Sequence, residues 1–274
     1  MILPGVGTRV IVQGITGERG AYHTGRMIEA GTKVVAGVSP GRGGHAIHGV
    51  PVYETVSDAL DEHEADATVV FDPPTEVPPS VYEAVEDELK LVVVSAKGVP
   101  LRDTMRFVRL AREKGTTVIG PASVGIARPG VSVLGSWPYE VLSKGGIAVV
   151  TRFCTLGVAA TAALTSAGLG QSLCIGLGGE HVVGTDERDV LPVISEDNRT
   201  KAVLLVIDPM RSVVPMCEAL DDLKLPAVAY VPGCADATIK RLEMVKGLES
   251  AGALVVESLE GAINALGEFG DDER

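Results

Sequence analysis

The chain has 274 residues and a formal net charge of −12, from 24 lysines and arginines against 36 aspartates and glutamates. This acidic balance argues against a nucleic-acid-binding protein, which needs a basic face for phosphates, and against attraction to anionic membrane surfaces. Hydrophobic residues make up 46% of the chain and aromatic residues only 4%, so we expect an aliphatic core of the kind found in α/β proteins.

Strand and helix patterns alternate through the first half of the chain. We predict strands at residues 8–13, 33–38, 67–71, 91–95 and 117–119, with a short extended piece at 47–53. Helices are expected after residue 20 to about 30, and over 57–63, 83–90 and 103–114, because Pro73 and Pro74 exclude a helix until about Pro79. The alternation predicts a doubly wound parallel sheet with right-handed crossovers.

Residues 120–145 break this rhythm and are rich in glycine, proline and serine, so we place a linker at 123–145 between domains 1–122 and 146–274. The alternation then resumes. Strands are predicted at 147–152, 173–177, 202–207, 227–231 and 254–257, and helices at 156–167, 213–220, 237–250 and 259–266. The chain therefore reads as two α/β domains of ordinary size.

The four cysteines, Cys154, Cys174, Cys217 and Cys234, form no C-x-x-C pair. We expect thiols in a reducing cytoplasm rather than disulfides or a zinc site. No basic segment precedes an apolar run at the N-terminus, so we expect no signal peptide, and no apolar stretch reaches the ~20 residues that span a bilayer.

The first strand runs into a glycine-rich turn, GITGERG, before the first helix. Gly14, Gly17 and Gly20 follow the spacing G-x-x-G-x-x-G, which is neither the dinucleotide pattern G-x-G-x-x-G nor a Walker A loop. Such a turn presents free backbone N–H groups at a helix N-terminus, where anions bind. A tight turn that needs glycine only for its backbone conformation is the alternative.

A second glycine turn, SPGRGG at 39–44, follows the second strand and is expected beside the first. Arg19 and Arg42 then suggest a ligand that carries several phosphates. Val38 and Ser39 stand where NAD-binding folds carry an acidic residue for the adenosine ribose, which disfavours NAD.

These segments together resemble the α subunit of succinyl-CoA synthetase, the ADP- or GDP-forming succinate–CoA ligase. The resemblance is carried by Q-G-x-T-G at 13–17, G-T-K-x-V-x-G-V-x-P-G-x-G-G at 31–44, G-x-P-V at 49–52 and G-P at 120–121. It implies an α/β fold with an N-terminal Rossmann-like CoA-binding domain followed by a flavodoxin-like α/β domain. It also implies CoA as cofactor, a small carboxylic acid as substrate, and an ATP-grasp β-like partner subunit that holds ATP and Mg²⁺.

The resemblance further implies which residues contact CoA. Arg42 replaces a lysine of the family, and Lys97 stands where the family has an acid. The expected CoA-binding residues are Gly14, Thr16, Gly17, Glu18, Arg19, Gly20, Ser39, Pro40, Arg42, Phe71, Pro73, Ser95, Ala96 and Lys97.

The family's chemistry runs through a phosphorylated histidine in a G-H-A-G-A loop of the second domain, and this loop is missing here. Residues 230–234 (YVPGC) pass directly into 235–240. Three weaker catalytic candidates remain: His181 on a glycine loop, Asp208 where the family has a glutamate, and Cys154 at a helix start that favours the thiolate. A surface histidine, a turn aspartate and a structural cysteine are their alternatives.

Two functions follow from this pattern. The first is the CoA-binding subunit of an ATP-dependent acid–CoA ligase that works without the phosphohistidine relay, which the full-length second domain favours. The alternative is a non-catalytic CoA- or acyl-CoA-binding module or scaffold. An NAD-dependent oxidoreductase is disfavoured by the missing ribose acid.

Overall fold

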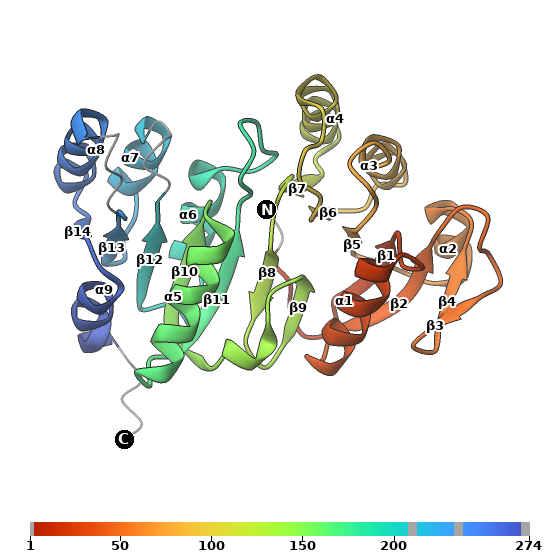
Figure 1. The fold of residues 1–274 in the computed structure, drawn as a ribbon, viewed down its shortest axis with the longest axis horizontal. Helices are drawn as coiled ribbons and strands as arrows, with labels where there is room; N and C mark the ends of the chain where they lie inside the picture. The colour runs from red at the N-terminus through yellow and green to blue at the C-terminus, as the bar shows by residue number, and fades with distance from the viewer. Residues whose placement is uncertain (1–2, 208–212, 233–237, 270–274) are drawn as a thin grey trace. The chain divides into compact units, whose positions relative to one another are not determined.

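The chain folds as two compact α/β units (Figure 1). The computed structural model describes residues 3–207, 213–232 and 238–269. The first unit comprises Met1–Tyr139 and Leu177–Thr185, and the second comprises Glu140–Gly176 and Asp186–Arg274.

In the first unit, strands and helices alternate as the sequence pattern predicts. The strands are β1 (Arg9–Gln13), β2 (Lys33–Val38), β3 (Ala46–Ile47), β4 (Val50–Tyr53), β5 (Ala67–Val70), β6 (Leu91–Val94), β7 (Thr117–Ile119), β8 (Gly125–Arg128) and β9 (Ser132–Gly135). The helices are α1 (Glu18–Glu29), α2 (Val56–Glu62), α3 (Val77–Glu86) and α4 (Leu101–Lys114), and a short 3₁₀ turn (Tyr139–Val141) ends the segment. Helix α3 begins earlier than expected because Pro78 and Pro79 lie in its first turn, where proline is tolerated.

The main sheet of this unit runs in the order β3-β4-β2-β1-β5-β6-β7. All its pairs are parallel except the antiparallel edge pair β3–β4. From β4 to β7 this is the Rossmann order, and the predicted doubly wound sheet is confirmed. The chain leaves β1 in one direction and returns to β5 on the other side, so the carboxyl ends of β1 and β5 flank the switch point where such folds bind ligands.

The core of this unit is aliphatic, as its composition predicts. Helices α2, α3 and α4 cover one face of the sheet, and their buried side chains, such as Val81 and Phe107, pack against strand residues such as Val92. Helix α1 lies with strand β9, where Thr32 Oγ1 donates to the Val133 carbonyl (2.7 Å) and accepts from the Val133 N–H (2.9 Å).

Residues 123–139 lie within the first unit, although 123–145 was expected to be a linker. They form the antiparallel hairpin β8–β9, in which Gly125 pairs with Gly135. A Cβ at Gly125 would lie 2.0 Å from the Leu134 carbonyl oxygen, so glycine is required by close backbone packing. The glycine content that indicated a linker therefore reflects a tightly paired hairpin.

The second unit is built on five parallel strands in the order β11-β10-β12-β13-β14, the flavodoxin-like arrangement. These strands are β10 (Lys144–Thr151), β11 (Gln171–Gly176), β12 (Ala202–Val206), β13 (Ala227–Tyr230) and β14 (Leu254–Val256). The helices are α5 (Cys154–Ser166), α6 (Glu187–Ser195), α7 (Val214–Asp221), α8 (Thr238–Ser250) and α9 (Leu259–Leu266), and a 3₁₀ turn (Gly267–Phe269) follows. Helices α5 and α9 lie together on one face, and α6, α7 and α8 follow one another on the other.

Helix α6 is absent from the sequence-based prediction because Pro192 interrupts its pattern. A capping box nevertheless stabilises the N-terminus of α6. Asp186 Oδ1 accepts from the Arg188 N–H (2.9 Å), and Asp189 Oδ2 accepts from the Asp186 N–H (2.9 Å). Across the described ranges, no helix is both long and apolar enough to cross a membrane.

Candidate functional site

The glycine turn after β1 forms the base of the site. Gly14 has a φ of +72°, and its N–H donates to the Val38 carbonyl at the end of β2 (2.9 Å). A Cβ at Gly20 would lie 2.0 Å from the Gly14 carbonyl oxygen, so the predicted spacing places these two glycines in direct backbone contact. The N-cap Gly17 offers no side-chain cap, which leaves N–H groups of the first turn of α1 available to an anion.

A cavity of about 730 Å³ opens over this turn at the carboxyl ends of β1, β2, β5 and β6. It lies at the switch point of the sheet, where the Rossmann arrangement binds ligands. Its lining residues are Gly14, Thr16, Gly17, Glu18, Arg19, Gly20, Ser39, Phe71, Asp72, Pro73, Pro74, Ala96 and Lys97.

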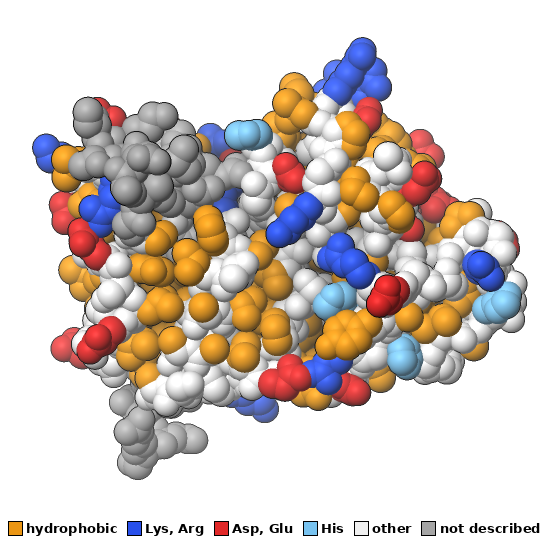
Figure 2. Space-filling model, in the orientation of Figure 1, with side chains coloured by type: hydrophobic (Ala, Val, Ile, Leu, Met, Phe, Trp, Pro, Cys, Tyr) orange, Lys and Arg blue, Asp and Glu red, His pale blue; other side chains and the backbone are white. Residues whose placement is uncertain are grey.

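Two cations face this cavity. Arg19 Nη2 donates to Ser95 Oγ (3.2 Å), so the buried Ser95 supports the arginine from behind the lining. Among the residues that the structure describes, neither Arg19 nor Lys97 forms an ion pair with a carboxylate. Figure 2 shows Lys and Arg side chains beside His side chains over the part of the first unit that holds α1 and the neighbouring loops. The cavity therefore suits an anionic ligand despite the acidic chain.

The second glycine turn has a different arrangement from the one expected. The Gly41 N–H donates to Glu54 Oε2, and the Gly43 N–H donates to Glu54 Oε1 (2.7 Å). These two N–H groups hold the pKa of the Glu54 carboxyl below its usual range. A carboxylate of the chain itself thus occupies the Gly41 and Gly43 amides beside Arg42, the residue that the sequence linked to a phosphate.

Of the three residues expected from this turn, only Ser39 lines the cavity, where its Oγ lies 2.6 Å from Thr16 Oγ1. Pro40 and Arg42 are exposed outside the lining. A role of Arg42 at the rim stays a prediction.

Replacing Glu54 with glutamine should loosen this turn, because an amide has only one oxygen with which to accept the two N–H groups. In the wild type, the pKa of Glu54 is lowered in the folded protein, so its hydrogen bonds to Gly41 and Gly43 are fully present above the ordinary glutamate pKa. They are lost as the pH falls through the pKa of Glu54 in the folded protein. We expect lower hydrogen-exchange protection factors at Gly41 and Gly43 in E54Q than in the wild type at neutral pH, and a fall of the wild-type protection factors only in acid. Equal exchange in both proteins at neutral pH would contradict this role.

Phe71, one of the residues expected to contact CoA, lines the cavity, and a histidine stacks on it. The rings of His23 and Phe71 lie 5.2 Å apart at 12°, and Tyr22 meets His23 edge-on at 5.1 Å. Burial, with a smaller contribution from Arg19, lowers the pKa of His23. The lowered pKa favours the neutral ring, which backs the cavity residue Phe71 without itself lining the cavity.

Asp72 and Pro74 also line the cavity, and the sequence reasoning did not single them out. The signal was present, since the run Asp72-Pro73-Pro74 directly follows β5 at the carboxyl edge of the sheet. Ser80 Oγ donates to Asp72 Oδ2 (2.8 Å). Burial raises the pKa of Asp72.

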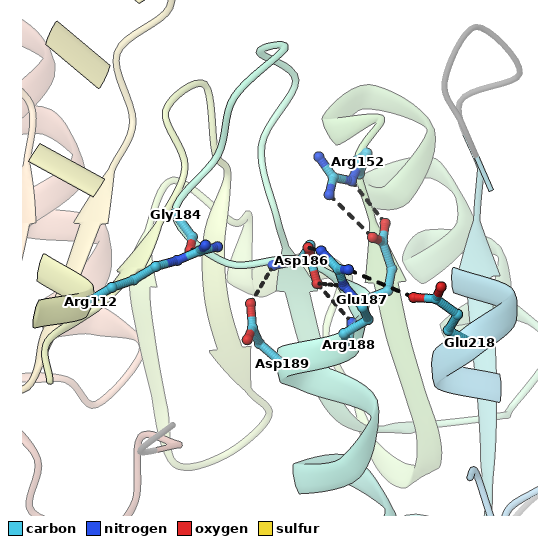
Figure 3. Close-up of polar contacts among 8 residues, drawn as sticks. All are labelled: Arg112, Arg152, Gly184, Asp186, Glu187, Arg188, Asp189 and Glu218. Carbon is cyan, nitrogen blue, oxygen red and sulfur yellow. Dashed lines mark hydrogen bonds and ion pairs between the residues drawn. The ribbon is translucent and has the colours of Figure 1, made fainter. Parts of the chain in front are cut away.

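The glycine loop that carries His181 folds with the first unit, although it follows a strand of the second. Glu180 Oε1 accepts from the Gly98 N–H (2.8 Å), beside the cavity residue Lys97. Arg112 Nη2 donates to the Gly184 carbonyl (3.3 Å; Figure 3). His181 itself is exposed, and it stays a candidate by residue type and by its place next to Glu180.

In the second unit, β10 leads into α5 with the predicted Cys154 as the first helical residue, half-exposed behind the exposed Phe153. The preceding Arg152 forms a buried pair with Glu187 through two hydrogen bonds, Nε to Oε1 (2.8 Å) and Nη2 to Oε2 (3.1 Å; Figure 3). Burial raises the pKa of the Cys174 thiol to about 12, so that thiol is inert. Asp208 lies outside the described residues, as do Gly233 and Cys234 of the shortened loop.

Comparison with known families matches two regions of the chain. Residues 7–98 match the CoA binding domain, and residues 150–269 match the CoA-ligase domain. The first range contains the cavity lining, and the second contains β11, α6 and the later strands.

Two relatives match this chain over more than two thirds of their own length. The chain is 38% identical over 261 residues to succinate–CoA ligase [ADP-forming] subunit alpha 2 of Archaeoglobus fulgidus, covering 95% of this chain and 91% of that protein. It is 40% identical over 202 residues to the ADP-forming sulfoacetate–CoA ligase subunit SqwL of an Acholeplasma species, covering 73% and 68%.

Solved structures share the fold. An ATP citrate lyase of Methanosaeta concilii in complex with (3S)-citryl-CoA superimposes with a TM-score of 0.82 at 21% identity, covering 97% of this chain. A dinucleotide-forming acetyl-coenzyme A synthetase of Ca. Korarchaeum cryptofilum gives 0.80 at 18% identity, covering 94%. The chain spans 51% and 60% of those two longer chains.

Proposed function

The chain belongs to the succinate–CoA ligase α-subunit family, and on that premise we propose that it is the CoA-binding subunit of an ADP-forming acid–CoA ligase. The observation that carries this function is the cavity at the switch point, with the uncapped start of α1 and two unpaired cations facing it. A non-catalytic CoA module is the weaker candidate, since the CoA-ligase match extends over residues 150–269.

The cavity is proposed to bind CoA through its phosphates. Gly17, Glu18 and Arg19 at the start of α1 line the cavity, and their N–H groups together with the Arg19 guanidinium suit a diphosphate. Lys97 supplies a further positive charge at the end of β6, and Phe71 and Pro73 supply the apolar wall. The Ser95 hydroxyl, which the sequence assigned to direct contact, acts here by holding Arg19.

The chemistry is proposed to divide between two chains. A β-like ATP-grasp partner binds ATP with Mg²⁺ and a small carboxylic acid, and the acid's carboxylate attacks the γ-phosphorus to give an acyl phosphate and ADP. The CoA thiol loses its proton, and its sulfur attacks the acyl carbon, so that phosphate leaves with the electron pair of the broken C–O bond. We place this reaction in the cytoplasm, where CoA and ATP are both available.

The missing G-H-A-G-A loop means that the phosphoryl group cannot rest on a histidine at that position. Direct transfer from acyl phosphate to CoA is therefore the route that we propose. His181, Asp208 and Cys154 are the remaining candidates for assisting it, with His181 suited by type to accept the thiol proton. Incubation of the pair with γ-labelled ATP should leave this chain without acid-labile label while acyl-CoA still forms. A labelled histidine on this chain would contradict the direct route.

Arg19→Ala should weaken CoA binding about tenfold to a hundredfold, because a charge-assisted hydrogen bond contributes roughly 1.5–3 kcal/mol. Arg106→Ala, which removes an exposed arginine from α4, is the matched control and should bind CoA like the wild type. Isothermal titration of CoA into each variant measures the difference. If both variants bound CoA with equal affinity, the proposed contact between Arg19 and the CoA phosphates would be wrong.

The function as a whole is tested by expressing the chain with the product of the adjacent gene, which the proposal expects to be an ATP-grasp chain. The proposal expects the two to co-purify and to release ADP only when an acid and CoA are both present. CoA binding without ADP release under any acid would favour the non-catalytic module instead.

A further inference from the structure

Two acidic residues, Glu18 and Asp72, line the cavity at the switch point of the first unit, and Asp72 is the less exposed of them. It follows β5, lines the cavity and is half-buried. A Cβ at residue 14 would lie only 2.6 Å from Asp72 Oδ1, so the carboxyl group rests directly against the backbone of the glycine turn. Ser80 Oγ donates to Oδ2 (2.8 Å) and fixes the group from the side of α3.

No cation of the described chain neutralises this carboxyl group. Arg19 and Lys97 line the same cavity without an ion pair to it, and its charged neighbour Glu76 is acidic. Burial raises the pKa of Asp72, with Glu76 adding to the effect and Ser80 opposing it. The half-buried Asp72 carboxyl group accepts a hydrogen bond from Ser80, so its removal from water is only partly compensated. A ligand that donates a further hydrogen bond to Asp72 removes this energetic cost.

A carboxyl group here does not suit a phosphate, because two anions repel each other. The phosphates have their own place at the start of α1, beside Arg19. CoA also carries neutral donors, namely the adenine amino group and the amide and hydroxyl groups of the pantetheine arm. These are the groups that an aspartate at the edge of a phosphate site can recognise.

We propose that Asp72 is a specificity-determining residue that accepts a hydrogen bond from a neutral N–H or O–H donor of the cofactor, resting on the proposed CoA site. The carboxyl group thereby selects a ligand that presents such a donor next to its diphosphate, and it disfavours a ligand that presents a further anion there. Ser80 positions the acceptor, and the contact with Gly14 prevents it from turning away.

The test compares Asp72→Asn with the wild type by isothermal titration of CoA. Asparagine keeps the shape and one acceptor oxygen for Ser80, but turns an N–H₂ group toward the ligand's donor. We expect CoA binding to weaken about tenfold or more. Glu76→Gln, which removes the neighbouring charge outside the lining, should leave CoA affinity unchanged.

Whether Asp72→Asn weakens or strengthens CoA binding decides whether the carboxyl group accepts a hydrogen bond from CoA or only repels phosphates. If Asp72 only repelled phosphates, Asp72→Asn would bind CoA as tightly as the wild type or more tightly, and the inference would be wrong. Failure of the wild type itself to bind CoA would instead count against the proposed function, so the two failures are distinguishable.

Two fragments of the cofactor locate the donor and control for folding. Adenosine 3′,5′-bisphosphate carries the adenine amine, and 4′-phosphopantetheine carries the amides. We expect Asp72→Asn to weaken one fragment and leave the other unchanged, which also shows that the variant is folded. Equal losses for both fragments, or no loss for either, would overturn the inference.

Discussion

Arg152→Met will destabilise the second unit by about 3–5 kcal/mol, because it leaves the Glu187 carboxylate buried without its partner. The side chains of Arg152 and Glu187 are 14% and 6% exposed, and two hydrogen bonds join them (Figure 3). Methionine keeps the length of the arginine stem, so the loss reports the charge pair rather than a cavity. Urea unfolding followed by far-UV circular dichroism measures the change.

Arg188→Met, in the helix that carries Glu187, is the matched control. Its guanidinium is 52% exposed and pairs with Asp186 and the exposed Glu218, so we expect a loss below about 1 kcal/mol. The double variant Arg152→Met/Glu187→Leu should recover much of the stability, since no unpaired charge remains. Equal losses for Arg152→Met and Arg188→Met would contradict the importance of burial.

Gly20→Ala will destabilise the first unit by at least about 2 kcal/mol and abolish CoA binding. The new Cβ would meet the Gly14 carbonyl oxygen at 2.0 Å, and neither backbone can move without breaking the glycine turn. The single tryptophan, Trp137, is buried in the first unit, so its fluorescence during urea unfolding reports that unit.

Gly17→Ala is the control for this turn. Its Cβ would lie 3.4 Å from the same oxygen, and its φ of −70° suits any residue. We therefore expect its free energy of unfolding to stay within about 0.5 kcal/mol of the wild-type value. Comparable losses at positions 17 and 20 would show that the contact between Gly14 and Gly20 is not the constraint.

Local sequence patterns were sufficient for most of the strand and helix order and for the glycine turn, but not for helix α6 or the hairpin β8–β9. The spacing of Gly14, Gly17 and Gly20 predicted a tight turn at a helix N-terminus, and the resemblance to the ligase family implied CoA as its ligand. Strands of four to six aliphatic residues between helices are signals that depend only on neighbouring positions.

The parts that could not be predicted depend on contacts between residues far apart in sequence. Glu54 lies 13 residues from Gly41, whose N–H it accepts, and Glu180 lies 82 residues from Gly98. Nothing local distinguishes these carboxylates from solvated surface charges. The same holds for the hairpin at residues 125–135, whose glycines are typical of a linker until their pairing is known.

Hydrogen exchange in the presence of increasing CoA tests the central claim most directly, because it locates the bound cofactor on the chain. The account predicts saturable protection of the backbone amides at residues 14–20 and 95–98, with no such protection from NAD. Binding of CoA without protection of either segment, or equal protection by NAD, would contradict the assignment of this cavity to CoA.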